Sequence, residues 1–179
     1  MRQSLAEREP DARELLDRSA SLLNEAEQFM SDIVWAVSPQ HDTLESLFSR
    51  IHRQTADTCR AKRIAFRVEA DAPDGRAIPG TVRRGVFLVY KEALRNAVRH
   101  AGASSIAVRA GLADGVLSLE VTDDGRGIAP GGSTSAGGGQ GLGNMRVRAE
   151  EIGGTLEVAP AEGGGTRVSL AVKIAQEGH

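Results

Sequence analysis

The chain has 179 residues, of which 40% are hydrophobic and only 3% aromatic, so it can form one domain, with or without a helical appendage, around a core of mainly Val, Leu, Ile and Ala. Its formal net charge of -2 gives no general reason to expect a nucleic acid or an anionic membrane as a partner. The single cysteine, Cys59, excludes an intramolecular disulfide and fits a reducing cytoplasm, and no apolar run approaches the roughly 20 residues of a membrane span.

The first predicted element is a helix over about residues 10–36. Pro10 suits the first turn of such a helix, and Ser38-Pro39 ends it. Apolar residues recur at intervals of three and four, at Leu15, Leu16, Leu22, Leu23, Ala26, Phe29, Met30, Ile33, Val34 and Val37. Such a stripe must be buried, either against the chain's own domain or against a second copy in a dimer.

The remaining elements predict a mixed domain. A second helix starts at Asp42 or Thr43, with Asp42 as its cap and Glu45 three residues on, and continues to about residue 61. It is followed by a strand over 64–70, a helix over 82–101, strands over 105–110 and 116–122, a helix over 141–152, and closing strands over 155–159 and 166–174. Short turns between neighbouring strands favour antiparallel pairing, with helices on one face. The fold class is therefore α+β, a two-layer α/β sandwich.

Three polar residues of the third helix, Glu92, Asn96 and His100, are four apart and fall on one helix face. A Mg²⁺ ion that arrives with phosphates needs few protein oxygens, and the Asn96 carbonyl fits that need. Glu92 can orient a water or hydroxyl near a phosphate as a general base, while Arg99 and His100 can donate to phosphate oxygens. The alternative is the polar edge of an amphipathic helix, whose core-facing set is Val86, Val89, Ala93 and Ala97.

Asp123 ends a strand and is followed directly by Asp-Gly-Arg-Gly. A buried carboxylate that accepts a hydrogen bond from an exocyclic amine distinguishes adenine from guanine. Gly125 and Gly127 carry no Cβ, so the backbone can approach a base closely. The alternative is an ordinary Asp-Gly turn between strands.

The segment Gly139-Gln140-Gly141-Leu142-Gly143 opens a helix, and backbone N–H groups at a helix N-terminus form an anion site suited to phosphates. It matches neither a Walker A loop nor the dinucleotide fingerprint. Thr166 adds a hydroxyl at the start of the last strand. Residues 128–140 before the helix are rich in Gly, Ser and Ala and are predicted to be a mobile loop. The segments occur in a fixed order, and each supplies a different part of what Mg-ATP needs.

This ordered set resembles the ATP-binding fold shared by histidine kinases, gyrase-type ATPases, Hsp90 and MutL, the GHKL superfamily, over roughly residues 42–174. The resemblance implies ATP and Mg²⁺ as cofactors, with Asn96 on the metal, Asp123 on the adenine amine, Glu92 as the catalytic residue and a mobile lid at about 128–140. The other residues that it assigns to the nucleotide are Arg99, His100, Gly125, Gly127, Gly139, Gly141, Leu142, Gly143 and Thr166.

Two further runs narrow the resemblance to sensor histidine kinases of the nitrate-sensor and DesK type. They are residues 32–47, which contain Asp-Ile-Val-Trp-Ala-Val-Ser-Pro, and 143–149, which read Gly-Asn-Met-Arg-Val-Arg-Ala. In that family a two-helix hairpin dimerises. The resemblance implies that residues 1–38 are the remnant of this hairpin, 42–174 the catalytic domain and 175–179 a tail. It also implies a homodimeric parent, a response-regulator receiver domain as partner, and a cytoplasmic catalytic part whose parent reaches the membrane only through a missing N-terminal part.

None of the four histidines, His41, His52, His100 and His179, lies where the family carries its phosphoacceptor. The expectation is therefore a catalytic fragment that transfers the γ-phosphoryl group of ATP to a histidine on a helix missing from this chain, and that does not phosphorylate itself. Two alternatives remain at this point. One is a stand-alone serine kinase of the anti-sigma type, against which residues 35–39 argue, and the other is a non-catalytic, nucleotide-dependent interaction module.

Overall fold

The computed structural model describes residues 42–73, 75–127 and 139–174, together with residues 15, 16, 19, 23, 30, 34, 35 and 38. The seven of these that lie between 15 and 35 are helical. Most of the predicted helix over 10–36, nearly all of the predicted lid and the tail at 175–179 lie outside the described residues. The chain divides into two units, Met1–Ser38 and Pro39–His179. Within the described ranges, none of the helices combines the length and apolarity that a bilayer crossing requires.

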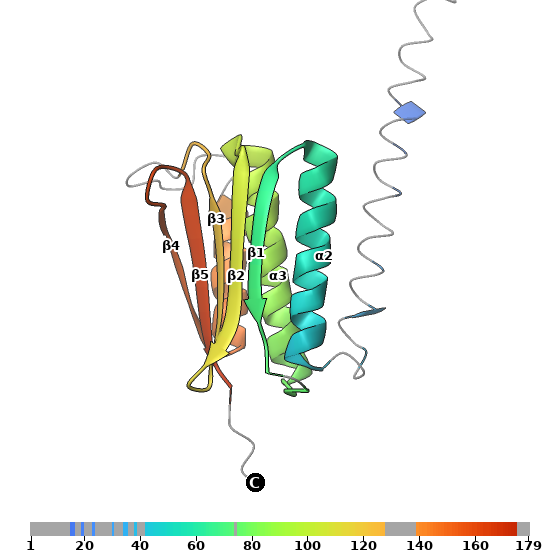
Figure 1. Ribbon diagram of the computed structural model, residues 1–179, viewed down its shortest axis with the longest axis vertical. Coiled ribbons are helices and arrows are strands. Elements are labelled where there is room, and N and C mark those ends of the chain that lie inside the picture. The colour runs from blue at the N-terminus through green and yellow to red at the C-terminus, as the bar shows by residue number, and fades with distance from the viewer. Residues whose placement is uncertain are drawn as a thin grey trace, which may run out of the picture. The chain divides into compact units, whose positions relative to one another are not determined.

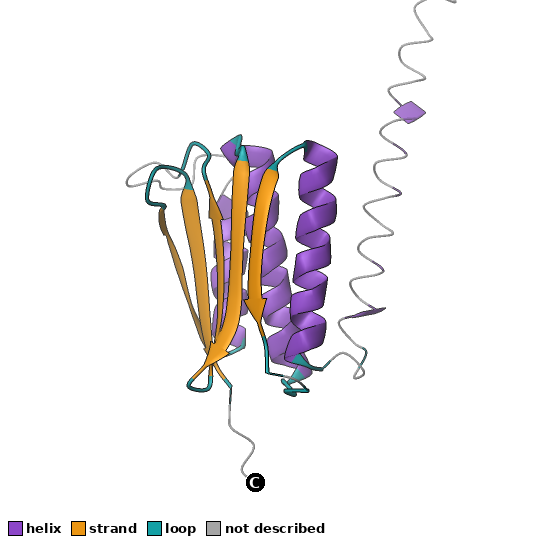
Figure 2. Ribbon diagram, viewed as in Figure 1, coloured by secondary structure: helices purple, strands orange, loops and turns teal. Residues whose placement is uncertain are grey.

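The second unit is a two-layer sandwich of one sheet and one helical layer. Its elements are, in chain order, α2 (Leu44–Lys62), β1 (Ala65–Asp71), α3 (Gly80–Asn96), the π-helix η2 (Ala97–Ala101), β2 (Ser105–Ala113), β3 (Val116–Asp123), α4 (Gly139–Glu151), β4 (Gly154–Pro160) and β5 (Thr166–Lys173). The strands form one five-stranded sheet in the order β1-β2-β3-β5-β4. In Figures 1 and 2, α3 lies behind the sheet and α2 is seen beside β1. The predicted fold class is confirmed.

One strand pair of the sheet is parallel. β2–β3, β3–β5 and β4–β5 are antiparallel, but β1 pairs with β2 in parallel, with Val68 opposite Val108. The physical reason is the connection: α3 and η2 lie between β1 and β2 and return the chain to the same end of the sheet, as a parallel pair requires. The antiparallel expectation concerned strands joined by short turns, and the pairing of β1 with β2 lies outside it.

The start of α2 also differs from the prediction. Thr43, not Asp42, caps the helix, and its hydroxyl accepts a hydrogen bond from the Ser46 N–H at 3.2 Å. The Asp42 carboxylate instead accepts from the Nε of Arg83 at 2.8 Å, and the Arg83 side chain is only 1% exposed. A buried guanidinium must be compensated, which is why Asp42 turns towards α3 rather than capping its own helix.

The core lies between the sheet and the helices. Strand residues at alternate positions face the helical layer, and the buried ones are Ile106, Val108, Ala110, Leu117, Leu119, Val121, Val168, Leu170 and Val172. From α3 and η2, the predicted core-facing set of Val86, Val89, Ala93 and Ala97 is buried, as expected. The core is largely aliphatic, in line with the low aromatic content.

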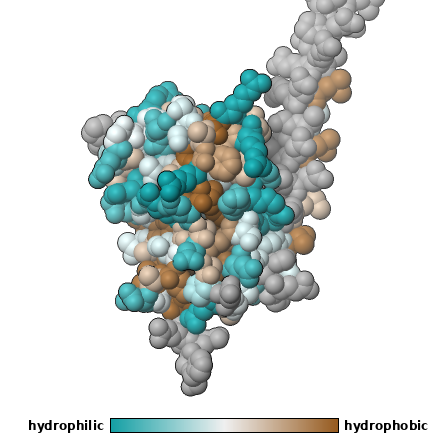
Figure 3. Space-filling model, in the orientation of Figure 1, coloured by the Kyte–Doolittle hydropathy of each residue, from teal (hydrophilic) through white to brown (hydrophobic). Residues whose placement is uncertain are grey.

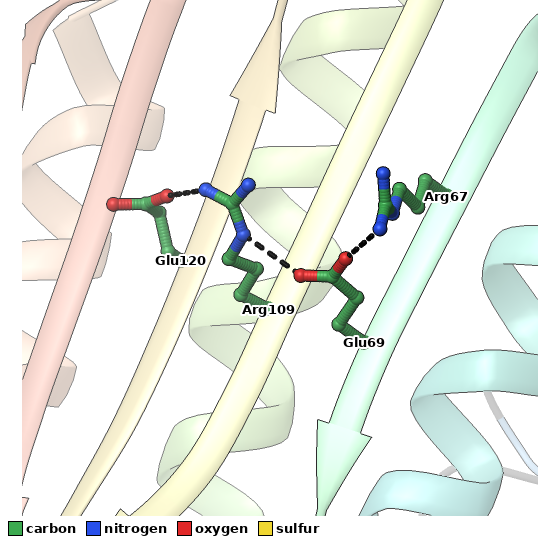
Figure 4. Close-up of polar contacts among 4 residues, drawn as sticks. All are labelled: Arg67, Glu69, Arg109 and Glu120. Atoms are coloured by element: carbon green, nitrogen blue, oxygen red, sulfur yellow. Dashed lines mark hydrogen bonds and ion pairs between the residues drawn. The ribbon is translucent and has the colours of Figure 1, made fainter.

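The opposite face of the sheet carries a row of charged side chains, and no described helix of the second unit covers it. Arg109 on β2 donates to Glu69 on β1 at 3.0 Å and to Glu120 on β3 at 3.4 Å, and Arg67 pairs with Glu69 (Figure 4). The hydrogen bond from Arg109, and then the charge of Arg67, lower the pKa of Glu69. Figure 3, which looks onto this face, shows hydrophilic and apolar side chains mixed. Exposed pairs of this kind contribute little to stability.

Candidate nucleotide-binding site

A cavity of about 160 Å³ lies within the second unit, between the sheet and the helical layer. Its lining residues come from α3, η2, β3, the turn after β3, α4, β4 and β5; they are Ala93, Asn96, Ala101, Val121, Asp123, Gly127, Leu142, Val158, Thr166 and Val168. Seven of these ten are Ala, Val, Leu or Gly, and the polar side chains come from Asn96, Asp123 and Thr166. An apolar pocket with a few convergent polar groups is typical of a small-molecule site.

Asp123 is the carboxylate of this cavity. It ends β3 and is buried, with 7% of the residue exposed. Its Oδ1 accepts hydrogen bonds from the N–H of Gly125 at 2.9 Å and the N–H of Thr166 at 3.3 Å. Both contacts fix the orientation of the side chain, and among the described residues neither involves Oδ2. The described residues therefore hold this carboxylate through one of its two oxygens, Oδ1.

The glycines around Asp123 allow backbone segments to pack closely against each other. A Cβ at Gly125 would overlap Ala101, and a Cβ at Gly165, whose φ is +89°, would overlap the carbonyl oxygen of Asp123. At Gly127, with φ of +71°, a Cβ would lie 2.9 Å from the carbonyl oxygen of Gly165. These three positions therefore require glycine for a structural reason, because any side chain there would force the neighbouring turns apart.

The polar residues of the third helix lie where α3 becomes a π-helix. Asn96 is the last residue of α3, and η2 continues directly from Ala97 to Ala101 before Gly102 ends it in the left-handed conformation. π-helical turns are rare in proteins, and those that do occur are often found at functional sites. The wider turn brings Ala101 into the wall of the cavity that Asn96 also lines.

Glu92 lies one turn before Asn96 and faces the first turn of α4. Its side chain is 11% exposed, and its Oε1 accepts from Arg95 at 2.6 Å. A Cβ at Gly141 would overlap this same Oε1 and would lie 3.7 Å from the amide nitrogen of Asn96. Glu92, Asn96 and the N-terminal turn of α4 therefore meet at one end of the site, next to Leu142, which lines the cavity.

Comparison with known proteins identifies the family. A family model for histidine kinase-, DNA gyrase B-, and HSP90-like ATPases matches residues 81–176, which is more than half of the 179 residues. The chain belongs to this ATPase family. All ten residues that line the cavity lie within the matched range.

Related sequences are sensor histidine kinases. The sensor histidine kinase LiaS of Bacillus subtilis is 37% identical over 110 residues, covering 62% of this chain and 30% of that protein. The nitrate/nitrite sensor protein NarQ of Escherichia coli is 39% identical over 101 residues, covering 56% of this chain and 18% of that protein. The chain thus spans less than a third of the length of either relative. These relatives favour the histidine kinase interpretation over the serine kinase and the interaction module.

Solved structures show the same fold. The histidine kinase domain of a blue-light activated histidine kinase from Erythrobacter litoralis superposes with a TM-score of 0.61 at 25% identity, covering 73% of this chain and 62% of that chain. The catalytic domain of histidine kinase ThkA superposes with a TM-score of 0.60 at 19% identity, covering 73% of this chain and 93% of that chain. The second match extends over nearly the whole of that catalytic domain.

The structure brings many of the predicted site residues to this cavity, but not all of them. Asn96, Asp123, Gly127, Leu142 and Thr166 line it, and Gly125, Gly141 and Glu92 lie beside them. The backbone N–H of Thr166 donates a hydrogen bond to Asp123. The sequence had pointed instead to the Thr166 hydroxyl as the group that this residue adds to the site. Arg99 and Gly143 are exposed, Gly139 begins α4, and the side chain of His100 lies outside the described part of the structure.

The apolar walls were not predicted from the sequence. Five further lining residues are Ala93, Ala101, Val121, Val158 and Val168. The two-residue alternation of β3 and β5 does place Val121 and Val168 on the helix side of the sheet, so this signal could have found them. The sequence also assigned no role to Asp124, whose carboxylate accepts hydrogen bonds from Ser104 and Ser105.

Proposed function

We propose that this chain is the ATP-binding catalytic part of a sensor histidine kinase, which transfers the γ-phosphoryl group of Mg-ATP to a histidine of the longer protein. The observation that carries the proposal is the buried Asp123 carboxylate, held through one oxygen at the wall of an apolar cavity in an ATPase-family domain. Phosphoryl transfer depends mainly on positioning and charge neutralisation, and the parts for both lie around this cavity.

Adenine recognition falls to Asp123. Adenine carries an exocyclic amine, which donates to a carboxylate, whereas guanine presents a carbonyl oxygen at the same ring position and would repel it. Since the protein uses Oδ1 for its own N–H groups, Oδ2 accepts from the amine. Val121, Val168 and Leu142 supply the apolar surfaces against which the base packs.

Asn96 is the residue that would hold Mg²⁺. Among the described residues no cluster of three or more His, Cys, Asp or Glu side chains could bind a metal by itself. Mg²⁺ bound with nucleotide phosphates keeps several waters and takes only one or two protein oxygens, so a lone Asn96 side chain at the cavity wall fits that requirement. When bound, the ion would neutralise charge on the phosphate oxygens.

Glu92 and the start of α4 complete the phosphate end of the site. The backbone N–H groups of the first turn of α4, from Gly139 to Leu142, would receive phosphate oxygens. Glu92 lies beside this turn. It would accept the proton that the imidazole of the acceptor histidine loses from its other ring nitrogen when the attacking nitrogen bonds to phosphorus. Arg95 holds the carboxylate in place.

The wider biological role follows from the same proposal. In the longer protein the phosphorylated histidine would pass its phosphoryl group to a response-regulator receiver domain, and two copies would pair through a dimerisation hairpin to which residues 1–38 belong. Residues 42–174 would form the catalytic domain, on the cytoplasmic side of a membrane-anchored parent.

The test is phosphoryl transfer from labelled ATP, in the presence of Mg²⁺, to a separately supplied helix that carries a histidine. A label on the helix that is lost in acid and kept in base is the expected result. Glu92→Gln should retain ATP binding and slow the transfer by about 10²-fold or more, which is the usual contribution of a general base. A label that is stable in acid would indicate a hydroxyl acceptor and contradict the proposal.

A further inference from the structure

The side chain next to the adenine-binding carboxylate has a different set of partners. Asp124 accepts hydrogen bonds through Oδ1 from the N–H of Ser104 at 2.8 Å and the N–H of Ser105 at 2.9 Å, and through Oδ2 from the hydroxyl of Ser104 at 2.5 Å. These bonds, first of all that from the Ser104 side chain, lower the pKa of Asp124. The carboxylate therefore ties the turn after β3 to the segment between η2 and β2.

Backbone contacts continue the same attachment. The N–H of Asp124 donates to the carbonyl of Ser105 at 3.3 Å, and the N–H of Arg126 donates to the carbonyl of Ala101 at 2.8 Å. Gly125 packs so closely on Ala101 that a Cβ would overlap it. The turn at 123–127 thus rests on the end of the π-helix, and the two sides each place a residue, Asp123 and Ala101, in the wall of the cavity.

The orientation of Asp123 depends on this turn. Its Oδ1 is held by the N–H of Gly125, which lies in the turn itself, so a displacement of the turn moves the carboxylate. A hydrogen bond weakens steeply when its angle departs from linearity. A small rotation of Asp123 would therefore weaken its bond to an adenine amine without removing either group from the site.

We propose that Asp124 is a positioning residue that fixes the Asp123 turn on the end of η2 and thereby sets the selectivity of the pocket for adenine over guanine. The proposal rests on the nucleotide-binding function proposed above and assigns a role to a residue that is not among those lining the cavity. If the carboxylate served only to stabilise the fold, its removal would lower the melting temperature but leave the selectivity of the folded protein unchanged.

The test compares the dissociation constants of Mg-ATP and Mg-GTP by calorimetry in a set of variants. Asp124→Ala removes all three side-chain hydrogen bonds, Ser104→Ala removes one, and Ser104→Thr keeps the hydroxyl. Asp57→Ala removes an exposed carboxylate from α2, remote in sequence from the pocket, and serves as the charge control. Asp124→Ala should reduce the preference for ATP by about tenfold, because the charge-assisted bond to adenine loses its geometry.

Ser104→Ala should reduce the preference in the same direction by a smaller factor, while Ser104→Thr and Asp57→Ala should keep the preference of the unaltered chain. An unchanged ATP-to-GTP ratio in Asp124→Ala would overturn the proposal, as would equal ratios in Ser104→Ala and Ser104→Thr if Asp124→Ala does not fold. Failure of the nucleotide-binding function is recognised separately, because the unaltered chain would then bind neither nucleotide.

Discussion

Substituting Gly141 separates the proposed catalytic role of Glu92 from the stability of the fold. Gly141 is in the first turn of α4, and its φ is not in the left-handed region, so the backbone accepts an alanine there. The added Cβ, however, would occupy the place of the Glu92 Oε1. Because this atom is at the end of a rotatable side chain, Gly141→Ala should move the carboxylate rather than unfold the helix.

The two effects on stability nearly cancel. Replacing glycine by alanine in a helix stabilises it by roughly 0.5–1 kcal/mol. Moving Glu92 breaks its pair with Arg95, whose side chain is 51% exposed, and pairs at this spacing contribute about 0.2–0.5 kcal/mol. The melting temperature should therefore change by no more than about 3 °C. Phosphoryl transfer at saturating ATP should fall by about 10²-fold, at the lower end of what a general base contributes.

Gly143 provides a matched control in the same helix. A Cβ there meets no atom within 4 Å, so Gly143→Ala changes helix propensity in the same way without touching Glu92. Thermal unfolding and the rate of transfer to a histidine-bearing helix should be measured for both variants. Equal transfer rates in the two would refute the reasoning, since they would show that the position of Glu92 does not matter. Unfolding of Gly141→Ala alone would show that Glu92 cannot move.

Three other predictions concern groups outside the cavity. Asp42→Ala should lower the free energy of unfolding by about 2 kcal/mol, less than for a fully buried pair because Asp42 is 34% exposed, and a loss under 0.5 kcal/mol in denaturant titration would contradict this. The pKa of Asp124 is lowered on folding, so its contribution to stability is present above the unfolded pKa and disappears as the pH falls through the folded pKa. The melting temperature should therefore fall less between neutral pH and about pH 3 in Asp124→Asn than in the unaltered chain. An equal fall in both proteins would argue against a stabilising contribution from ionised Asp124. Burial raises the pKa of the Cys59 thiol, so this thiol should react with a disulfide reagent only when the chain unfolds. Rapid labelling of Cys59 in the native chain would contradict this prediction.

Local periodicity explains why much of the fold could be predicted from the sequence. The spacing of Val86, Val89, Ala93 and Ala97 predicts a buried helix face, and the alternation in β3 and β5 predicts a half-buried sheet. The ordered glycines and Asp123 predict the nucleotide pocket because backbone turns that pack this closely exclude side chains. Each periodic pattern and each glycine turn is formed by residues only a few positions apart in the sequence.

The features that the sequence did not predict depend on contacts between residues far apart in the chain or on the local backbone conformation. Asp42 satisfies the rules for a cap but is drawn to Arg83, 41 positions later, which leaves Thr43 as the cap. The four-residue spacing of Asn96 and His100 assumes an α-helix, and the π-helix that starts at Ala97 breaks that spacing. The parallel pairing of β1 with β2 follows from the crossover through α3, which local patterns cannot express.

The central claim is that Asp123 binds adenine. Asp123→Asn keeps an oxygen for the N–H groups of Gly125 and Thr166 but replaces the other oxygen with an amide that opposes the adenine amine. Calorimetric titration of the unaltered chain should show tighter binding of Mg-ATP than of Mg-GTP. Asp123→Asn should weaken ATP binding by roughly 10- to 150-fold, which corresponds to the roughly 1.5–3 kcal/mol of a charge-assisted hydrogen bond. Equal affinity of the unaltered chain for the two nucleotides, or unchanged ATP binding in the variant, would contradict the claim.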